Sequence, residues 1–245
     1  MKRYCILTLP RSGSQLCEKI LEDNNPNSYR LSEMFEGWYK FDFVLENNRI
    51  SKIPNLTKNL DRICNDYEYK LNLISNADPS VDYTLRIFLY NHRNLYIQNL
   101  IISRLLKSNF TFVSLKRNFE DVVLSNLIAK YYLNKGQNIY AMGTQITKEP
   151  IIIPIKENFV YYQISTLFTS YLCWDQRIKT LFGYNKVFNV QYESIYQDCE
   201  KILNHKVDGV EGKTLGTNGY DYIINKDEIR EIIRPYKELL DKQNG

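Results

Sequence analysis

The sequence predicts an α/β protein with three layers, in which a mostly parallel central sheet carries helices on both faces. Short apolar runs alternate along the chain with longer segments of helical periodicity, and this alternation favours parallel strands joined by helices. The length of 245 residues suits one large domain, and 44% of the residues are hydrophobic, as in globular proteins. No repeat or low-complexity linker divides the sequence, so residues 1–245 are expected to form a single domain.

The elements follow in order from these patterns. Residues 4–9 are a short apolar run suited to a buried strand. The further segments expected to be strands are residues 28–31, 81–89, 110–115 and 187–191. The segments with apolar side chains at helical spacing are residues 16–21, 57–75, 95–106, 119–133, 159–182, 195–203 and 227–240. Glycine and proline punctuate residues 134–158, and four glycines lie in residues 209–219, so both segments are expected to be irregular.

Charge and composition limit which partners, metals and compartments the sequence can indicate. Lysine plus arginine number 32 against 28 acidic residues, and a net charge of +4 is too small to indicate a nucleic-acid or membrane partner. An anionic small ligand remains compatible with it. The two histidines cannot build a three-histidine metal site, and no metal is expected. Five scattered cysteines, with no secretory signal and no apolar span of about 20 residues, predict reduced thiols and a cytoplasmic location.

The loop after the first expected strand has the composition of an anion site. Residues 10–15 read Pro-Arg-Ser-Gly-Ser-Gln and open a helix, whose first N–H groups and dipole favour negative charge. Gly13 lets the backbone approach a phosphate closely, Ser12 and Ser14 add hydroxyl donors, and Arg11 adds a cation. The loop lacks the lysine of the triphosphate P-loop, GxxxxGK[ST]. An ordinary strand-to-helix turn with a serine cap is the alternative.

A second candidate anion site follows the strand expected at residues 110–115. Arg117 stands at the strand end, Asn118 suits the N-cap of the next helix, and Asp121 occupies a position like that of a capping box. Ser125 lies eight residues after Arg117, roughly 9 Å along the helix from its start. The forked arginine and the serine hydroxyl could therefore meet on one phosphate. The alternative is an exposed arginine and an unrelated serine within a helix.

These two motifs resemble the phosphate-binding segments of sulfotransferases that use 3′-phosphoadenosine 5′-phosphosulfate (PAPS). Residues 10–14 resemble the 5′-phosphosulfate loop of that family, and residues 117–125 its 3′-phosphate motif, with Phe119 where the family usually has proline. The resemblance implies a P-loop-like sulfotransferase fold. It also implies that the 5′-phosphate and the sulfuryl bridge are held by Arg11, Ser12, Gly13, Ser14 and Gln15, and the 3′-phosphate by Arg117 and Ser125.

Weaker likenesses to the same family cover other parts of the chain. Residues 84–88 match a middle strand with a basic residue, here Arg86, and residues 190–195 and 219–225 resemble late segments of the family. Lys213, in the glycine-rich segment, is a further candidate ligand of the 3′-phosphate.

The resemblance also indicates where a general base belongs. Residues 32–35 read Ser-Glu-Met-Phe and resemble bacterial carbohydrate sulfotransferases, in which a glutamate of this region is the base, so Glu33 is the first candidate. Many cytosolic members use a histidine after the middle strand, which makes His92 the second candidate. Arg11, with the helix N-terminus, is expected to stabilise the leaving phosphate. Glu33 as a carboxylate at a helix start, and His92 as a surface residue, are the alternatives.

The expected function is therefore that of a transferase, a sulfotransferase that moves a sulfuryl group from PAPS to a hydroxyl of an acceptor. The acceptor is expected to be a small molecule or glycan, with carbohydrate or glycolipid sulfation in view, and no nucleic acid or membrane span is expected. Aromatic side chains after Glu33 suit either sugar stacking or core packing. The rival hypotheses are a nucleotide or sugar kinase of related fold and a non-catalytic nucleotide- or glycan-binding module. The identity of the acceptor and the oligomeric state stay open.

Overall fold

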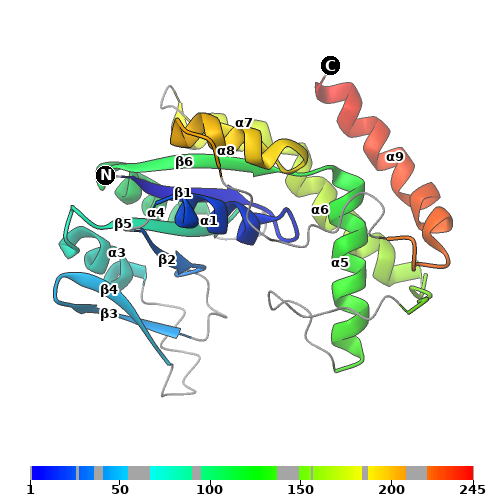
Figure 1. Ribbon diagram of the computed structural model, residues 1–245. Coiled ribbons are helices and arrows are strands. Elements are labelled where there is room, and N and C mark those ends of the chain that lie inside the picture. The colour runs from blue at the N-terminus through cyan, green and yellow to red at the C-terminus, as the bar shows by residue number, and fades with distance from the viewer. Residues whose placement is uncertain are drawn as a thin grey trace.

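The computed structural model describes residues 2–25, 28–35, 41–54, 67–89, 95–136, 149–155, 157–183, 187–207 and 220–244. Within these residues the five predicted strands form one sheet of order β2-β5-β1-β6-β7, and each neighbouring pair is parallel (Figure 1). Its strands are β1 (Arg3–Thr8), β2 (Ser28–Ser32), β5 (Asp82–Phe88), β6 (Phe110–Lys116) and β7 (Val187–Gln191).

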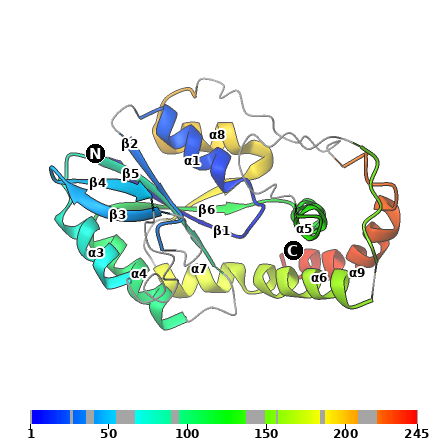
Figure 2. The same cartoon turned by 90° about the horizontal axis from the view of Figure 1, so that it is seen from below.

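Helices cover both faces of this sheet, which confirms the predicted three-layer α/β fold (Figure 2). The covering helices are α1 (Ser14–Asp23), α3 (Tyr67–Asn76), α4 (Leu95–Lys107), α7 (Trp174–Phe182) and α8 (Ile195–Leu203). Alternate side chains of β1 point to opposite faces. Cys5 and Leu7 therefore join a core with α3, α4 and α7, whereas Tyr4 and Ile6 join a second core with α1 and α8.

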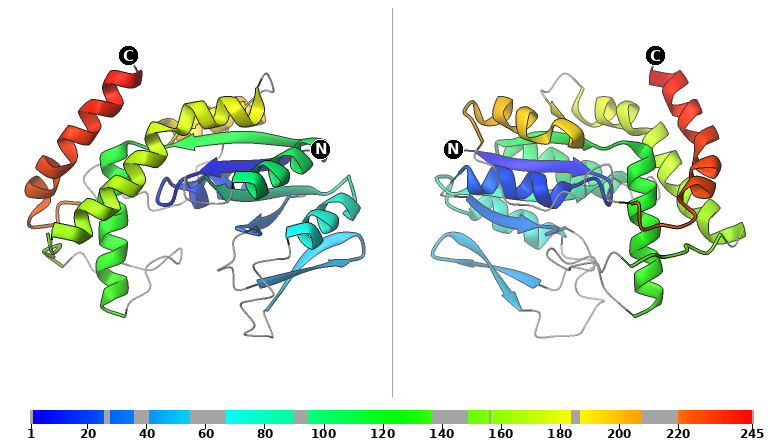
Figure 3. Two further views of the ribbon diagram at one scale, coloured as in Figure 1. Left: turned by 180° about the vertical axis from the view of Figure 1, so that it is seen from behind. Right: turned by 45° about the vertical axis from the view of Figure 1, so that its right-hand side comes forward.

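Three further helices pack beside the sheet, around a core of their own (Figure 3). They are α5 (Phe119–Asn134), α6 (Glu157–Leu172) and α9 (Lys226–Asn244). Phe119 at the start of α5 contacts Phe168 and Tyr171 of α6 edge-on. Because α5 continues directly from β6, this helical unit stands at the carboxyl ends of the strands.

The prediction of one helix over residues 159–182 is wrong, because the structure has two helices with Cys173 between them. The two halves belong to different cores. Val160 of α6 packs with α5 and α9, whereas Trp174 of α7 packs on the sheet, where its indole N–H donates to Ser114 Oγ over 3.0 Å. The chain bends so that one apolar face can follow both cores.

A hairpin was not predicted, and it forms a second, two-stranded sheet from β3 (Phe41–Glu46) and β4 (Arg49–Pro54). Asn47 and Asn48 at its tip have φ values of 49° and 61°, the conformation of a two-residue hairpin turn that asparagine tolerates. Ile50 enters the core with α3 and α4, and its N–H donates to the Tyr83 hydroxyl over 3.1 Å.

Some other predicted segments lie partly or wholly outside the residues that the structure describes. Of the helix predicted over residues 57–75, α3 covers the last part, and residues 55–66 lie outside the described residues. The glycine-rich segment 209–219 lies outside them too, as does most of 134–148. No helix in the described parts of the chain is both long and apolar enough to cross a membrane.

Candidate functional site

The sheet topology brings the two predicted anion loops to one place. β1 lies between β5 and β6, and the chain crosses from one side of β1 to the other between those two strands. Ligands of open parallel sheets bind beyond the carboxyl ends of the strands at such a switch point. Since β1 and β6 are parallel neighbours, residues 9–13 after β1 and residues 117–118 after β6 lie at the same edge.

The loop after β1 is shaped by two residues in the left-handed region, Arg11 with φ 65° and Gly13 with φ 83°. Gly13 is the N-cap of α1, and its carbonyl accepts from the N–H groups of Leu16 and Cys17 over 3.0 and 3.1 Å. In the described structure no cap side chain accepts a hydrogen bond from the first turn of α1. Polar groups of an anion can therefore bind at this helix N-terminus.

A close approach of Tyr192 explains why residue 13 is glycine. Tyr192 opens the 3₁₀ turn η1 (Tyr192–Ser194) after β7, and a Cβ on Gly13 would stand 2.1 Å from two of its ring carbons. The backbone conformation is a second reason for glycine at this position, because other residues rarely adopt a φ of 83°. The ring of Tyr192 thus forms a wall of the loop, a role that the sequence resemblance did not reveal.

Arg117 links the two loops. It is 8% exposed, and its guanidinium donates to the Arg11 carbonyl over 3.1 Å and to the Tyr220 hydroxyl over 3.0 Å. Its Cζ lies 4.3 Å from the centroid of the Tyr192 ring, a cation–π contact. The Nε of Arg117 is buried and has no hydrogen-bond partner among the described residues. A buried cation with an unsatisfied N–H suits an anionic ligand.

Ser125 belongs to the same cluster, as the eight-residue spacing predicted. The Nε of Arg11 donates to Ser125 Oγ over 3.0 Å. The Tyr220 hydroxyl also interacts with Ser125 and donates to the Asp121 carbonyl over 3.1 Å. Burial raises the pKa of Tyr220, against the opposing effect of the Arg117 charge, so the phenol stays protonated and able to donate.

Asn118 is the N-cap of α5, as predicted, and its side chain accepts from the Glu120 N–H over 3.0 Å. The predicted capping box with Asp121 is wrong, because a different carboxylate accepts the hydrogen bond from the N-cap. The backbone N–H of Asn118 donates to Glu193 Oε1 of η1 over 2.9 Å, and not to Asp121. A residue 75 positions away thus takes the place of the local carboxylate.

The first candidate base, Glu33, lies beside the loop after β1. It follows β2 directly, after a bulge and Ser32, whose φ of 53° is in the left-handed region. Arg86 of β5 places an N–H 3.2 Å from Glu33 Oε1 and another 3.3 Å from Ser14 Oγ. Glu33 is therefore connected to the N-terminus of α1 through one guanidinium. His92, the second candidate base, lies outside the described residues, and so does Lys213.

Glu18 of α1 is a member of this site that the sequence reasoning missed. It is 1% exposed, and Arg86 Nε lies 3.1 Å from its carboxylate. Burial raises the pKa of Glu18 to about 7, opposed by the charges of Arg86, Arg30 and Lys52. A signal was present, because positions 14, 17, 18 and 21 share one helical face, and a carboxylate on a buried face needs a partner.

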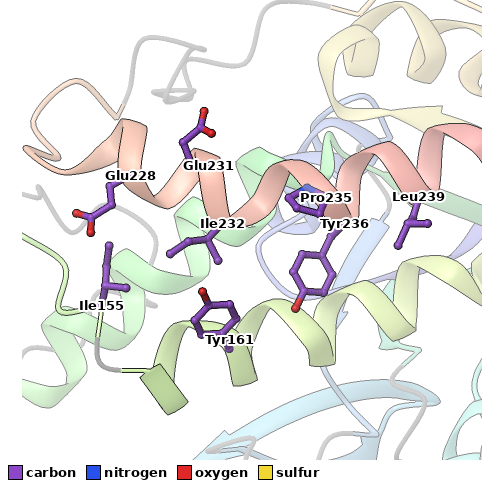
Figure 4. Close-up of a pocket in the computed structure, with 8 residues that line it drawn as sticks. All are labelled: Ile155, Tyr161, Glu228, Glu231, Ile232, Pro235, Tyr236 and Leu239. Atoms are coloured by element: carbon purple, nitrogen blue, oxygen red, sulfur yellow. The ribbon is translucent and has the colours of Figure 1, made fainter.

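A metal site and a separate surface pocket are the other possible ligand sites in the described part of the chain. Within the described ranges no group of three histidine, cysteine or acidic side chains could hold a metal ion. A mostly apolar surface pocket between α6 and α9 contains Tyr161 and Tyr236, and none of the candidate site residues lines it (Figure 4).

Comparisons with known proteins give no family for the chain. No protein-family model matches it. The chain is similar to the DNA-directed RNA polymerase subunit beta′ of Lactobacillus acidophilus, with 26% identity over 146 residues, and of Lactobacillus helveticus, with 25% over 144 residues. Each match covers 59% of this chain, and the chain spans about a tenth of the length of these relatives. Likeness at this identity and coverage does not show membership in a family.

Proposed function

We propose that this protein is a sulfotransferase that transfers a sulfuryl group from PAPS to a hydroxyl of a carbohydrate or glycolipid. One observation carries the proposal: Arg117 donates to the carbonyl of Arg11, and Arg11 donates to Ser125, so that both anion motifs form one cluster. A donor with a 5′-phosphosulfate and a separate 3′-phosphate requires two such anion sites side by side. A single phosphate would require only one.

The residues of the cluster suit the two ends of that donor. The N-terminus of α1, with Arg11 and the nearby Ser12, Ser14 and Gln15, is suited to the phosphosulfate. Arg117 and Ser125 are suited to the 3′-phosphate, since the buried Nε of Arg117 has no other partner in the described structure and arginine binds phosphate through its fork of donors.

The chemistry follows from these positions. The bond between sulfur and the bridging oxygen breaks, its electron pair stays on the phosphate, and a new bond joins sulfur to the acceptor oxygen. Glu33 takes the proton of the acceptor hydroxyl, as a general base. Arg11 and the helix N-terminus stabilise the charge that develops on the phosphate. Arg86 supports this assignment, because it holds Glu33 and Ser14 on one guanidinium.

A thermal-shift experiment tests the donor site. Adenosine 3′,5′-bisphosphate, the product that keeps both phosphates, is expected to raise the melting temperature, because a ligand at 100 times its Kd stabilises by about 2.7 kcal/mol. ATP with magnesium is expected to have no such effect. Stabilisation by ATP and magnesium alone would contradict the proposal and favour a kinase.

A transfer assay tests the reaction itself. Incubation with ³⁵S-labelled PAPS and a glycan panel is expected to label at least one acceptor. If the bisphosphate binds but no hydroxyl-bearing acceptor is labelled, the protein is a binding module and not an enzyme.

A further inference from the structure

The guanidinium of Arg86 contacts side chains from three separate segments. NH1 donates to Ser14 Oγ at the start of α1 over 3.3 Å, Nε lies 3.1 Å from Glu18 one turn later, and NH2 lies 3.2 Å from Glu33 after β2. The side chains of Arg86 and Glu18 are only 6% and 1% exposed. Their charges are therefore poorly screened by solvent, and a change in one charge alters the electrostatics of the others.

The other charges around Glu18 are more distant or more exposed. Arg30 of β2 lies 3.9 Å from the Glu18 carboxylate and also pairs with Glu22 of α1, and both of these side chains are about a quarter exposed. Lys52 of β4 adds a weaker attraction. Arg86 is thus the principal counter-ion of Glu18, whereas Arg30 is a more distant and more exposed one that it shares with Glu22.

We propose that Glu18 is a positioning residue, whose carboxylate offsets the positive charge that Arg86 presents to an anion at Ser14 and whose protonation leaves that charge available to the anion. The inference rests on the proposed function, because the anion is taken to be the 5′-phosphate end of the donor. With Glu18 ionised, the guanidinium of Arg86 is shared between two carboxylates, Glu18 and Glu33. With Glu18 protonated, one of these two carboxylates is neutral, and the N–H of Arg86 next to Ser14 attracts the anion more strongly.

Both states of Glu18 exist near neutral pH, since burial raises its pKa to about 7. Anion binding then raises the pKa of the Glu18 carboxylate and draws a fraction of a proton from the solvent onto it. Ligand affinity and protonation at Glu18 are linked, and linkage requires that each favour the other.

The test measures the binding of adenosine 3′,5′-bisphosphate by calorimetry between pH 6 and pH 8, for the wild type and for Glu18→Gln. The variant mimics the protonated state, so it is expected to bind about fivefold more tightly than the wild type at pH 8, a typical coupling between linked sites. At pH 6 the two proteins are expected to bind alike. Titrations in two buffers of different ionisation enthalpy are expected to show more proton uptake for the wild type. The ligand's own ionisation cancels in this difference.

Glu22→Gln is the matched control, because it removes a carboxylate from the same helix that pairs with Arg30 and not with Arg86. It is expected to keep a pH-dependent affinity like that of the wild type, moved to slightly lower pH because, besides burial, Glu22 contributes to the raised pKa of Glu18. A variant with structural damage would bind more weakly, whereas the inference requires tighter binding.

The outcomes separate the two proposals. Equal affinities of wild type and Glu18→Gln at pH 8, with equal proton uptake, would overturn the role of Glu18 and leave the donor site intact. A wild type that does not bind the bisphosphate would overturn the proposed function. If circular dichroism shows that Glu18→Gln does not fold, the test relies on the proton uptake of the wild type on binding, corrected for the ionisation of the free ligand. Uptake near zero would then overturn the inference.

Discussion

The Nε of Arg11 donates a hydrogen bond to Ser125 Oγ over 3.0 Å, although the two residues are 114 positions apart in the chain. Arg11 lies in the loop after β1, and Ser125 lies in the second turn of α5, after β6. The bond therefore joins the two segments that the sequence marked as separate anion motifs. Their side chains form one cluster because β1 and β6 are neighbours in the sheet.

Replacement of Arg117 by alanine tests the assignment of the 3′-phosphate. We expect affinity for adenosine 3′,5′-bisphosphate to fall about 10- to 100-fold, since a hydrogen bond to a charged group contributes about 1.5–3 kcal/mol. Affinity for adenosine 5′-phosphosulfate, which lacks that phosphate, is expected to change little. Calorimetry on both ligands gives the comparison, with Lys116→Ala as control because Lys116 pairs with the exposed Asp175. Equal losses for the two ligands would refute the assignment.

Ser125→Ala removes a smaller contribution from the same site. The variant loses the acceptor of the Arg11 Nε and one proposed phosphate contact, so the bisphosphate affinity is expected to fall about fivefold, or about 1 kcal/mol. Ser165→Ala on the exposed side of α6 serves as the control, since the Ser165 hydroxyl donates to the Tyr162 carbonyl of its own helix. An unchanged affinity for Ser125→Ala would remove Ser125 from the site.

Gly13→Ala tests the contact with Tyr192, and Gly136→Ala is its matched control. Both glycines have positive φ, 83° and 74°, but a Cβ at residue 136 meets nothing within 4 Å in the described structure. We expect Gly136→Ala to lower the free energy of unfolding by about 1 kcal/mol, from backbone strain alone. Gly13→Ala is expected to lose about 1–3 kcal/mol more, from overpacking.

Urea denaturation measures both variants, and a double variant identifies the cause. In a Tyr192→Ala background, Gly13→Ala should cost no more than Gly136→Ala does, because the ring carbons at 2.1 Å are gone. A full loss in that background would show that the ring is not responsible.

Glu33→Gln tests the proposed base. The variant keeps a side chain of the same size next to Arg86 and removes one of its two carboxylate partners, so bisphosphate affinity is expected to be retained or increased, while sulfuryl transfer falls by about 100-fold or more. Glu46→Gln, on the exposed end of β3, is the control. An unchanged rate would move the assignment to His92.

The stability of the protein is expected to depend on pH through Glu18. Its pKa is raised from 4.5 to about 7 by burial, so the folded state keeps a proton that the unfolded state has already lost. This contribution to stability is complete below about pH 4.5 and disappears as the pH rises through 7. A shift of this size corresponds to about 3 kcal/mol. Urea denaturation at several pH values should show that the free energy of unfolding falls with rising pH in the wild type and in Glu22→Gln. If the free energies of unfolding of the wild type and Glu18→Gln change in parallel with pH, the assignment to Glu18 is contradicted.

The sequence by itself determined the features that depend on near neighbours in the chain. Apolar runs predicted the three inner strands of the central sheet, because β1, β5 and β6 are buried along most of their length and such strands are mainly apolar. The edge strands β2 and β7 are only partly buried, and short segments before a helix predicted them. The spacing of Arg117 and Ser125, and the capping role of Asn118, are properties of one strand end and one helix start. The hairpin turn at Asn47 and Asn48 also has a local signal, since asparagine tolerates the left-handed conformation of this turn.

Only the tertiary structure decided which distant side chains meet. The helix break at Cys173 arises because α6 and α7 pack on different cores, which the periodicity of a single segment does not contain. Likewise Tyr192 against Gly13, and Arg86 between Glu18 and Glu33, depend on strand order and on burial. A buried charge must find its partner in space, and any of several elements can supply it, so the sequence shows the need for a partner while the fold selects the residue.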